Sequence, residues 1–230
     1  MGGKLKFDKV HISGPNYALW VQGPNAKLEV INGSLIEANY FSISTDATLQ
    51  GGGLLYGGAD IMLKDSKFIA GETGFMTNVS PSTVNIENCE FSGNHQAAFL
   101  RGGTYTIKNS SFTLKAELES THSENNHMKQ WQDGNRAAFA GITIGNYLSS
   151  AYQYPTTVAM TGVTVKVEGT HASSFPAVHV CANATEDKGV TLTYDTTCSF
   201  TSTYDPAVEY GTANITVNGE AVKSNVKQET

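Results

Sequence analysis

The chain has 230 residues, and its 15 Lys or Arg against 21 Asp or Glu give a formal net charge of −6 at neutral pH. Charged residues make up only 16% of the sequence, whereas an average soluble domain has about a quarter. Because there is no basic field and no apolar run approaching the roughly 18 residues of a membrane-spanning helix, we expect neither a nucleic-acid partner nor membrane insertion.

From the N-terminus onward, an apolar pair separated by one residue recurs, followed by a polar turn residue and a third apolar residue. The second member of the pair falls at positions 7, 30, 63, 86, 107, 160, 194 and 217, so four of the seven steps are 21 to 23 residues long. The pairs are Leu5/Phe7, Leu28/Val30, Ile61/Leu63, Val84/Ile86, Tyr105/Ile107, Val158/Met160, Leu192/Tyr194 and Ile215/Val217.

Strands this short cannot bury a face alone, but stacked copies can pair with one another at about 4.8 Å. The repeat therefore predicts an all-β fold, a right-handed single-stranded parallel β-helix of about eight coils, as one domain over residues 1–230. An antiparallel β-sandwich also has short, regularly spaced strands, but it would not repeat the same residue classes in the same order. Met1-Gly2-Gly3-Lys4 contains no segment to cap such a solenoid, which predicts a module excised from a longer polypeptide.

Alternation along each strand sends the apolar pair inward. We expect Phe68, Phe91 and Phe112 to stack as an internal aromatic column. The turn residues Asn32, Asp65, Asn88 and Asn109 are expected to form a ladder, because Asn and Asp tolerate a left-handed backbone.

A second apolar motif runs in phase with the first. Its copies are Ala18-Leu19-Trp20-Val21, Gly74-Phe75-Met76-Thr77, Ala98-Phe99-Leu100-Arg101, Ala138-Phe139-Ala140-Gly141, Ala177-Val178-His179-Val180 and Ala207-Val208-Glu209-Tyr210. This alignment predicts an internal column of Phe75, Phe99 and Phe139. It also predicts an outward column of Trp20, Met76, Leu100, Ala140, His179 and Glu209, either covered by a loop such as Asn39–Gly53 or used as a contact surface.

The longer steps predict loops inserted near 39–57, 113–136, 145–156, 168–175 and 182–189, where a solenoid carries its function. Tyr147, Tyr152 and Tyr154 lie in one of them and suit stacking on sugar rings, and Trp131 is a further ligand-binding candidate. The alternative is that these tyrosines pack their loop against the barrel.

The 113–136 loop also contains His122, Glu124 and His127, which could ligate a metal or perform acid–base chemistry. The two histidines are five residues apart, which does not place them on one helical face, so a solvated loop or a partner-binding loop is the alternative. We assign no catalytic residue and no metal site from the sequence.

The three cysteines, Cys89, Cys181 and Cys198, form no zinc-binding pattern. Cys181 and Cys198 are 17 residues apart and could bridge neighbouring coils in an oxidising compartment. The alternative is that all three are buried small residues without a bridge.

The repeat resembles that of the pectin-lyase-like right-handed β-helix superfamily, which implies the fold and no activity. Phe91-Ser92-Gly93-Asn94 and Gly57-Gly58-Ala59 are similar to repeats of bacterial autotransporters and surface adhesins. Hydrolases of the superfamily carry paired aspartates, Asn-Thr-Asp and Gly-His-Gly, and none of these strings occurs here. Asp60 and Asp65 do not cluster with other acids as the calcium ligands of pectate lyases do, so we expect no resident cofactor and keep calcium as the one ion to test.

These observations predict a non-catalytic β-helix module of a bacterial cell surface or secreted protein, adhesin-like or glycan-binding, with a carbohydrate or a host-cell surface as partner. The first alternative is a polysaccharide-degrading enzyme, a lyase or a glycoside hydrolase. Such an enzyme would need carboxylates at a defined separation in a groove. The second alternative is a structural spacer.

Overall fold

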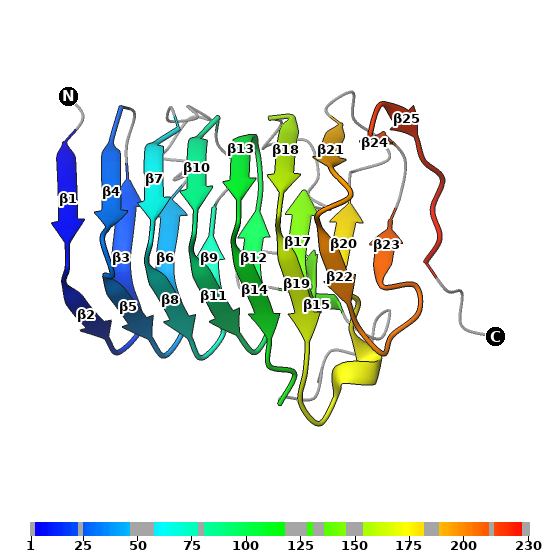
Figure 1. Ribbon diagram of the computed structural model, residues 1–230, viewed down its shortest axis with the longest axis horizontal. Coiled ribbons are helices and arrows are strands. Elements are labelled where there is room, and N and C mark those ends of the chain that lie inside the picture. Colours follow the sequence, from blue (N-terminus) through cyan, green and yellow to red (C-terminus); the bar gives the residue numbers. More distant parts are fainter. Residues whose placement is uncertain are drawn as a thin grey trace.

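A computed structural model describes residues 3–22, 25–46, 58–77, 81–117, 128–130, 136–145, 154–181, 189–211 and 214–226. The chain winds through three parallel sheets, which we call sheets A, B and C, and it visits them in that order in each coil. In Figure 1 it descends through β1 and β2 on the near side and returns through β3 on the far side while advancing toward the C-terminus, which is a right-handed path.

Sheet A contains eight parallel strands, one for each coil, and ends with one short antiparallel strand. The strands are β1 (Lys4–Asp8), β4 (Lys27–Ile31), β7 (Asp60–Lys64), β10 (Thr83–Glu87), β13 (Gly103–Lys108), β18 (Thr156–Thr161), β21 (Val190–Tyr194), β24 (Ile215–Val217) and the antiparallel β25 (Glu220–Ala221). The predicted parallel β-helix of about eight coils is confirmed.

Sheets B and C have seven strands each. Sheet B consists of β2 (His11–Gly14), β5 (Leu35–Ala38), β8 (Lys67–Ala70), β11 (Glu90–Gly93), β14 (Ser111–Leu114), β19 (Thr164–Val167) and β22 (Ser199–Thr201). Sheet C consists of β3 (Tyr17–Gln22), β6 (Phe41–Asp46), β9 (Thr73–Met76), β12 (Gln96–Leu100), β17 (Ala140–Gly145), β20 (Val178–Cys181) and β23 (Val208–Tyr210).

Two small elements lie between the coils. An antiparallel pair consists of β15 (Met128–Gln130), within the 113–136 insertion, and β16 (Arg136–Ala138), which begins at its last residue. A 3₁₀ turn, η1 (Ala172–Ser174), lies within the 168–175 insertion. The first expected insertion, near 39–57, begins differently, because Phe41–Asp46 pairs with β3 and forms β6.

Apolar side chains from all three sheets fill the interior in columns. The rings of Phe68 and Phe91 lie 4.7 Å apart at 11°, and those of Phe91 and Phe112 lie 4.7 Å apart at 4°. All three are 2% exposed or less, so the predicted aromatic column is confirmed. Offset stacking at this separation is favourable in addition to the area that it buries.

Four successive turns from sheet A to sheet B use the left-handed backbone region. Asn32, Asp65, Asn88 and Asn109 have φ values of 58°, 50°, 53° and 48°, as predicted for the ladder. The Asn88 side-chain amide donates to Oδ1 of Asp65 in the preceding coil at 2.9 Å, and Asn32 donates to Asp8 at 3.0 Å. These bonds hold successive coils in register on the polar side of the turn.

Two alignments made from the sequence are wrong. In the last coil, Leu192 pairs with Val217 rather than with Ile215, a shift of two residues. In sheet C, Ala98 pairs with Phe75, and Phe99 pairs with Met76, so Phe75 and Phe99 do not share an internal column. Phe139 lies between β16 and β17 and outside sheet C, and it stacks on His95.

Candidate functional site

Among the described residues, the outer face of sheet C combines aromatic, aliphatic, hydroxyl, imidazole and carboxylate side chains. Its central column runs along the helix axis with one residue per coil: Trp20, Ser44, Met76, Phe99, Thr143, His179 and Glu209. The sequence had placed Leu100 and Ala140 where Phe99 and Thr143 stand. Apart from Ser44, the corrected column is aromatic and apolar toward the N-terminal coils, and it is polar toward the C-terminal coils.

At the N-terminal end of this face, two aromatic side chains are open to solvent. Trp20 is 53% exposed and Tyr17 is 39% exposed, and their ring centroids lie 4.9 Å apart at 46°. Tyr17 also stacks on Phe41 of the next coil at 5.1 Å and 19°. The buried Phe41 fixes the orientation of Tyr17, so the Tyr17–Trp20 pair forms a supported aromatic surface.

In the middle of this face the side chains are buried. Phe41, Met76 and Phe99 form an apolar cluster separate from the interior of the solenoid. The Arg101 guanidinium lies 4.3 Å from the centroid of the Phe99 ring, and its Nε donates to the Thr77 carbonyl at 2.9 Å. Only 2% of Arg101 is exposed, so this charge rests on an aromatic face and a backbone carbonyl, away from solvent.

The C-terminal part of the face holds a buried hydrogen-bonded network. Nδ1 of His179 lies 2.6 Å from Oε2 of Glu209, and the side chains are 1% and 0% exposed. The Tyr204 hydroxyl donates to Oε1 of Glu209 at 2.8 Å. Burial and the neighbouring Glu209 carboxylate raise the pKa of Tyr204, so its hydroxyl keeps its proton and remains a donor. This network orients the imidazole firmly but lies out of reach of a large substrate.

A second histidine stands at the turn from sheet B to sheet C. The His95 ring stacks on Phe139 at 4.4 Å and 12°, and its Nδ1 lies 3.5 Å from Oε2 of Glu72. Next to it, the buried Gln96 accepts a hydrogen bond from the Thr73 hydroxyl at 2.7 Å and donates to the Ala138 carbonyl at 2.8 Å. These contacts attach the residues that directly follow the 113–136 insertion to the preceding coil.

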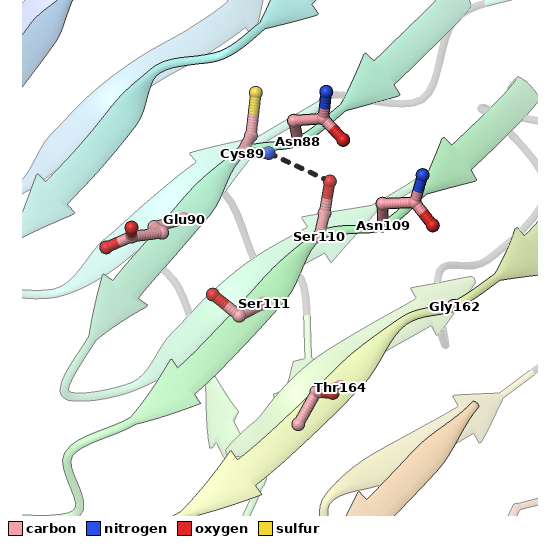
Figure 2. Close-up of a pocket in the computed structure, with 8 residues that line it drawn as sticks. All are labelled: Asn88, Cys89, Glu90, Asn109, Ser110, Ser111, Gly162 and Thr164. Atoms are coloured by element: carbon pink, nitrogen blue, oxygen red, sulfur yellow. Dashed lines mark hydrogen bonds between the residues drawn. The ribbon is translucent and has the colours of Figure 1, made fainter. Parts of the chain in front are cut away.

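Figure 2 shows a shallow groove along the turns that join sheet A to sheet B. It is lined by Asn88, Cys89, Glu90, Asn109, Ser110, Ser111, Gly162 and Thr164. The Cys89 backbone N–H donates to the Ser110 hydroxyl at 3.0 Å, the bond drawn in the figure. Burial raises the pKa of the Cys89 thiol to about 12, which leaves it protonated and unreactive at neutral pH.

All three cysteines are free thiols. No disulfide joins Cys181 and Cys198, so of the two alternatives the one without a bridge describes the chain, although Cys198 is only half-buried. Burial raises the pKa of the Cys181 thiol as well, and the nearby Arg101 charge opposes that shift without reversing it.

Most of the sequence-predicted site residues lie outside the described residues: Tyr147, Tyr152, Trp131, His122, Glu124 and His127. Tyr154 is described, is half-buried and stands two residues before β18. Sequence reasoning placed Trp20 on the correct face but missed its pairing with Tyr17. The signal was two aromatic residues three apart in a strand whose intervening residues are small or aliphatic.

Across the residues that the structure describes, no group of three or more His, Cys, Asp or Glu side chains could hold a metal ion. Within the same residues, no helix is long and apolar enough to cross a membrane. Comparisons with protein-family models, curated proteins and solved structures find no match.

Proposed function

We propose that this chain is a glycan-binding β-helix module of a cell-surface or secreted protein, and that the Tyr17–Trp20 pair is its contact surface. The observation that carries the proposal is the exposed Trp20 ring against Tyr17, with Phe41 stacked behind it. Tryptophan side chains are highly buried on average, so one that is about half exposed is a candidate contact residue. A rigid aromatic surface suits the apolar C–H face of a sugar ring, and the tyrosine hydroxyl can bond to sugar hydroxyls.

The repeat of the coils supports a further proposal, that the chain belongs to the pectin-lyase-like superfamily and is of the bacterial adhesin type. This assignment places the module outside the cell, where its partner would be a polysaccharide or a glycosylated host surface. Calcium is the one ion to include in binding measurements, because it is the ion that the pectate lyases of this superfamily bind.

A glycan-array screen of the purified chain, with and without calcium, tests the proposal. We expect Trp20→Ala to weaken binding by about tenfold or more, which corresponds to about 1.4 kcal/mol of lost contact free energy. Met62→Ala is the matched control, because Met62 is 45% exposed on the outer face of sheet A. Equal binding by the wild type and Trp20→Ala would refute the Tyr17–Trp20 surface.

The tyrosine loop remains a separate prediction. The double variant Tyr152→Ala/Tyr154→Ala, together with single changes at Tyr147 and Trp131, would show whether the 113–136 and 145–156 insertions add to the binding surface. Loss of binding in these variants with Trp20→Ala unaffected would move the site to the insertions and leave the glycan-binding function intact.

Polysaccharide cleavage is the second candidate function. The network of His179, Glu209 and Tyr204 joins a carboxylate to two possible proton carriers, and a polysaccharide would reach it only if the outer face of sheet C opened. Incubation of each bound glycan with the chain, followed by detection of new reducing ends or unsaturated ends, distinguishes cleavage from binding. Products that disappear in Glu209→Gln would support an enzyme. Intact glycans would support the binding module, and a chain that neither binds nor cleaves would be a spacer.

A further inference from the structure

The outer face of sheet A has two halves of different chemistry. In the first three strands of the sheet it is charged, and ion pairs connect neighbouring coils as far as the end of β10: Lys4 to Glu29 at 2.8 Å, Lys27 to Asp60 at 3.1 Å and Lys64 to Glu87 at 3.3 Å. From β10 onward, uncharged residues replace these pairs at the first two outward positions of each strand.

The first outward position of five consecutive strands is threonine. The register pairs Thr83 with Thr104, Thr104 with Thr157, Thr157 with Thr191 and Thr191 with Thr216. The second outward position carries Asn85, Thr106, Ala159 and Thr193. Together these two columns form what we call the threonine face, and every member is exposed or half-exposed.

The geometry of this face is set by the sheet. Neighbouring coils repeat at about 4.8 Å, and the two columns lie about 6.6 Å apart along each strand because outward positions alternate. The side chains directly beneath, Val84, Tyr105, Val158 and Leu192, are 1% exposed or less. Threonine is stiff at χ1, so its methyl and hydroxyl groups keep one arrangement from coil to coil.

We propose that the threonine face binds a crystalline lattice of water, the surface of ice. The hydroxyl groups of the two columns therefore recur on a regular two-dimensional grid, as the oxygen atoms on a crystal face of ice also do. Regularly spaced hydroxyl groups can join that lattice, and the methyl groups between them exclude disordered water. This inference rests on sheet A alone and is independent of glycan binding by the outer face of sheet C.

A crystalline polysaccharide is the competing ligand for a flat sheet, and the composition of the face argues against it. Neither outward column contains an aromatic ring or a charged group from β10 to β24. Sugar surfaces are recognised through aromatic stacking, which on this molecule is available at Tyr17 and Trp20 instead. The charged residues Glu87 and Lys108 stand at the third outward position, beside the face rather than within it.

The experiment measures the growth of single ice crystals and the recrystallisation of polycrystalline ice in solutions of the purified chain. We expect the wild type to suppress both and Thr157→Lys to lose at least tenfold in potency, because the long ammonium side chain stands off the flat surface. Thr164→Lys is the matched control, since Thr164 is exposed in the same coil on the outer face of sheet B. Thermal unfolding of all variants verifies that they fold.

Three outcomes would overturn the inference. The wild type could leave ice growth unchanged, Thr164→Lys could lose as much potency as Thr157→Lys, or the chain could adsorb to an insoluble polysaccharide through Thr157 without affecting ice. Thr157→Val and Thr157→Ser divide the effect between the hydroxyl and the methyl group. Trp20→Ala is expected to keep full ice activity, which separates this result from the glycan-binding result.

Discussion

Glu209 places a carboxylate in a site where neither it nor its partner His179 contacts solvent. Removing one member of such a pair leaves the other buried without its partner, which costs about 3–5 kcal/mol. We therefore expect Glu209→Ala to lower the free energy of unfolding by roughly 3 kcal/mol or more in urea titrations. The network would be structurally unimportant if the loss stayed below about 1 kcal/mol.

The matched control for this variant is Glu90→Ala. Glu90 forms an ion pair of 2.8 Å with Lys67, but both side chains are more than half exposed. Exposed pairs contribute about 0–1 kcal/mol, so this change should be close to neutral. The contrast between the two glutamates isolates the effect of burial from that of pairing.

The Cys89 thiol predicts how stability responds to alkaline pH. In the unfolded chain a thiol ionises with a pKa of about 8.5, whereas burial raises the pKa of Cys89 in the folded chain to about 12. Between these values the unfolded state binds fewer protons than the folded state, so the free energy of unfolding falls as pH rises. The slope for one such thiol reaches about 1.4 kcal/mol per pH unit.

Urea titrations at several pH values between about 8 and 11 measure this slope. Burial shifts the pKa of Cys181 and of Tyr105 in the same direction, so the wild-type slope is the sum of several groups. Cys89→Ala should make it shallower, whereas Asn85→Ala, which changes an exposed residue of the same coil that has no titratable group, should leave it unchanged. An identical slope in both variants would contradict the assignment to Cys89.

At the scale of single elements, the turn from sheet A to sheet B tests the value of a left-handed asparagine. Asn88 has a φ of 53° and bonds to Asp65. Alanine in this region costs about 1–2 kcal/mol, and glycine accommodates the same φ freely. We expect Asn88→Ala to destabilise the fold by that amount and Asn88→Gly to destabilise it less, as measured by thermal and urea unfolding.

Asn85→Ala is the control for the turn, because Asn85 is an exposed residue in the extended β10 of the same coil. It should change stability by less than about 0.5 kcal/mol. If Asn88→Gly proves as destabilising as Asn88→Ala, the side-chain bond to Asp65 rather than the backbone conformation would account for the loss.

The sequence predicted sheets A and B well because their strands alternate between buried and exposed residues. Strand β10 reads Thr-Val-Asn-Ile-Glu, and only its two aliphatic residues are buried. Strand β12, Gln-Ala-Ala-Phe-Leu, is buried at every position, at its outward as well as at its inward residues. A strand buried on both faces shows no alternation, so its register cannot be read from the pattern, and the alignment slipped at Phe99.

The same limit applies to the candidate site. Trp20 stands in an alternating strand and was placed correctly, whereas Phe99 and Thr143 stand in covered strands and were not. The His179–Glu209 pair could be aligned from the motif, because the sequence around each residue repeats. The third member, Tyr204, reaches the pair from a turn that follows no repeat, and only the structure reveals its contact.

At the scale of the whole molecule, the coils depend on their neighbours, since each strand obtains its hydrogen bonds from the coil on either side. In the last coil, two local arrangements supply hydrogen bonds that a neighbouring strand supplies elsewhere. In sheet A, β25 folds back on β24 and pairs Thr216 with Ala221. In sheet C, the strand β23 is closed by the single residue Asn225.

Through its backbone and its side chain, Asn225 forms hydrogen bonds to β23 like those that a residue of a neighbouring strand would form. Its N–H donates to the Tyr210 carbonyl at 3.1 Å, its Oδ1 accepts from the Tyr210 N–H at 2.6 Å, and its Nδ2 donates to the Val208 carbonyl at 3.0 Å. An edge strand with open N–H and C=O groups is a template for pairing with another chain. Asn225 therefore limits both the fraying of β23 and its association.

Asn225→Ala removes the two side-chain bonds, each worth about 1 kcal/mol, and reopens the edge of sheet C. We expect a stability loss of about 2 kcal/mol in urea, together with concentration-dependent association that sedimentation velocity detects as an increase in the sedimentation coefficient. Ser224→Ala changes the preceding exposed residue and should match the wild type in both measurements. If Asn225→Ala lost stability without associating, Asn225 would stabilise β23 but would not be needed to prevent its pairing with a second chain. The exposed edge of sheet C would then not promote association by itself.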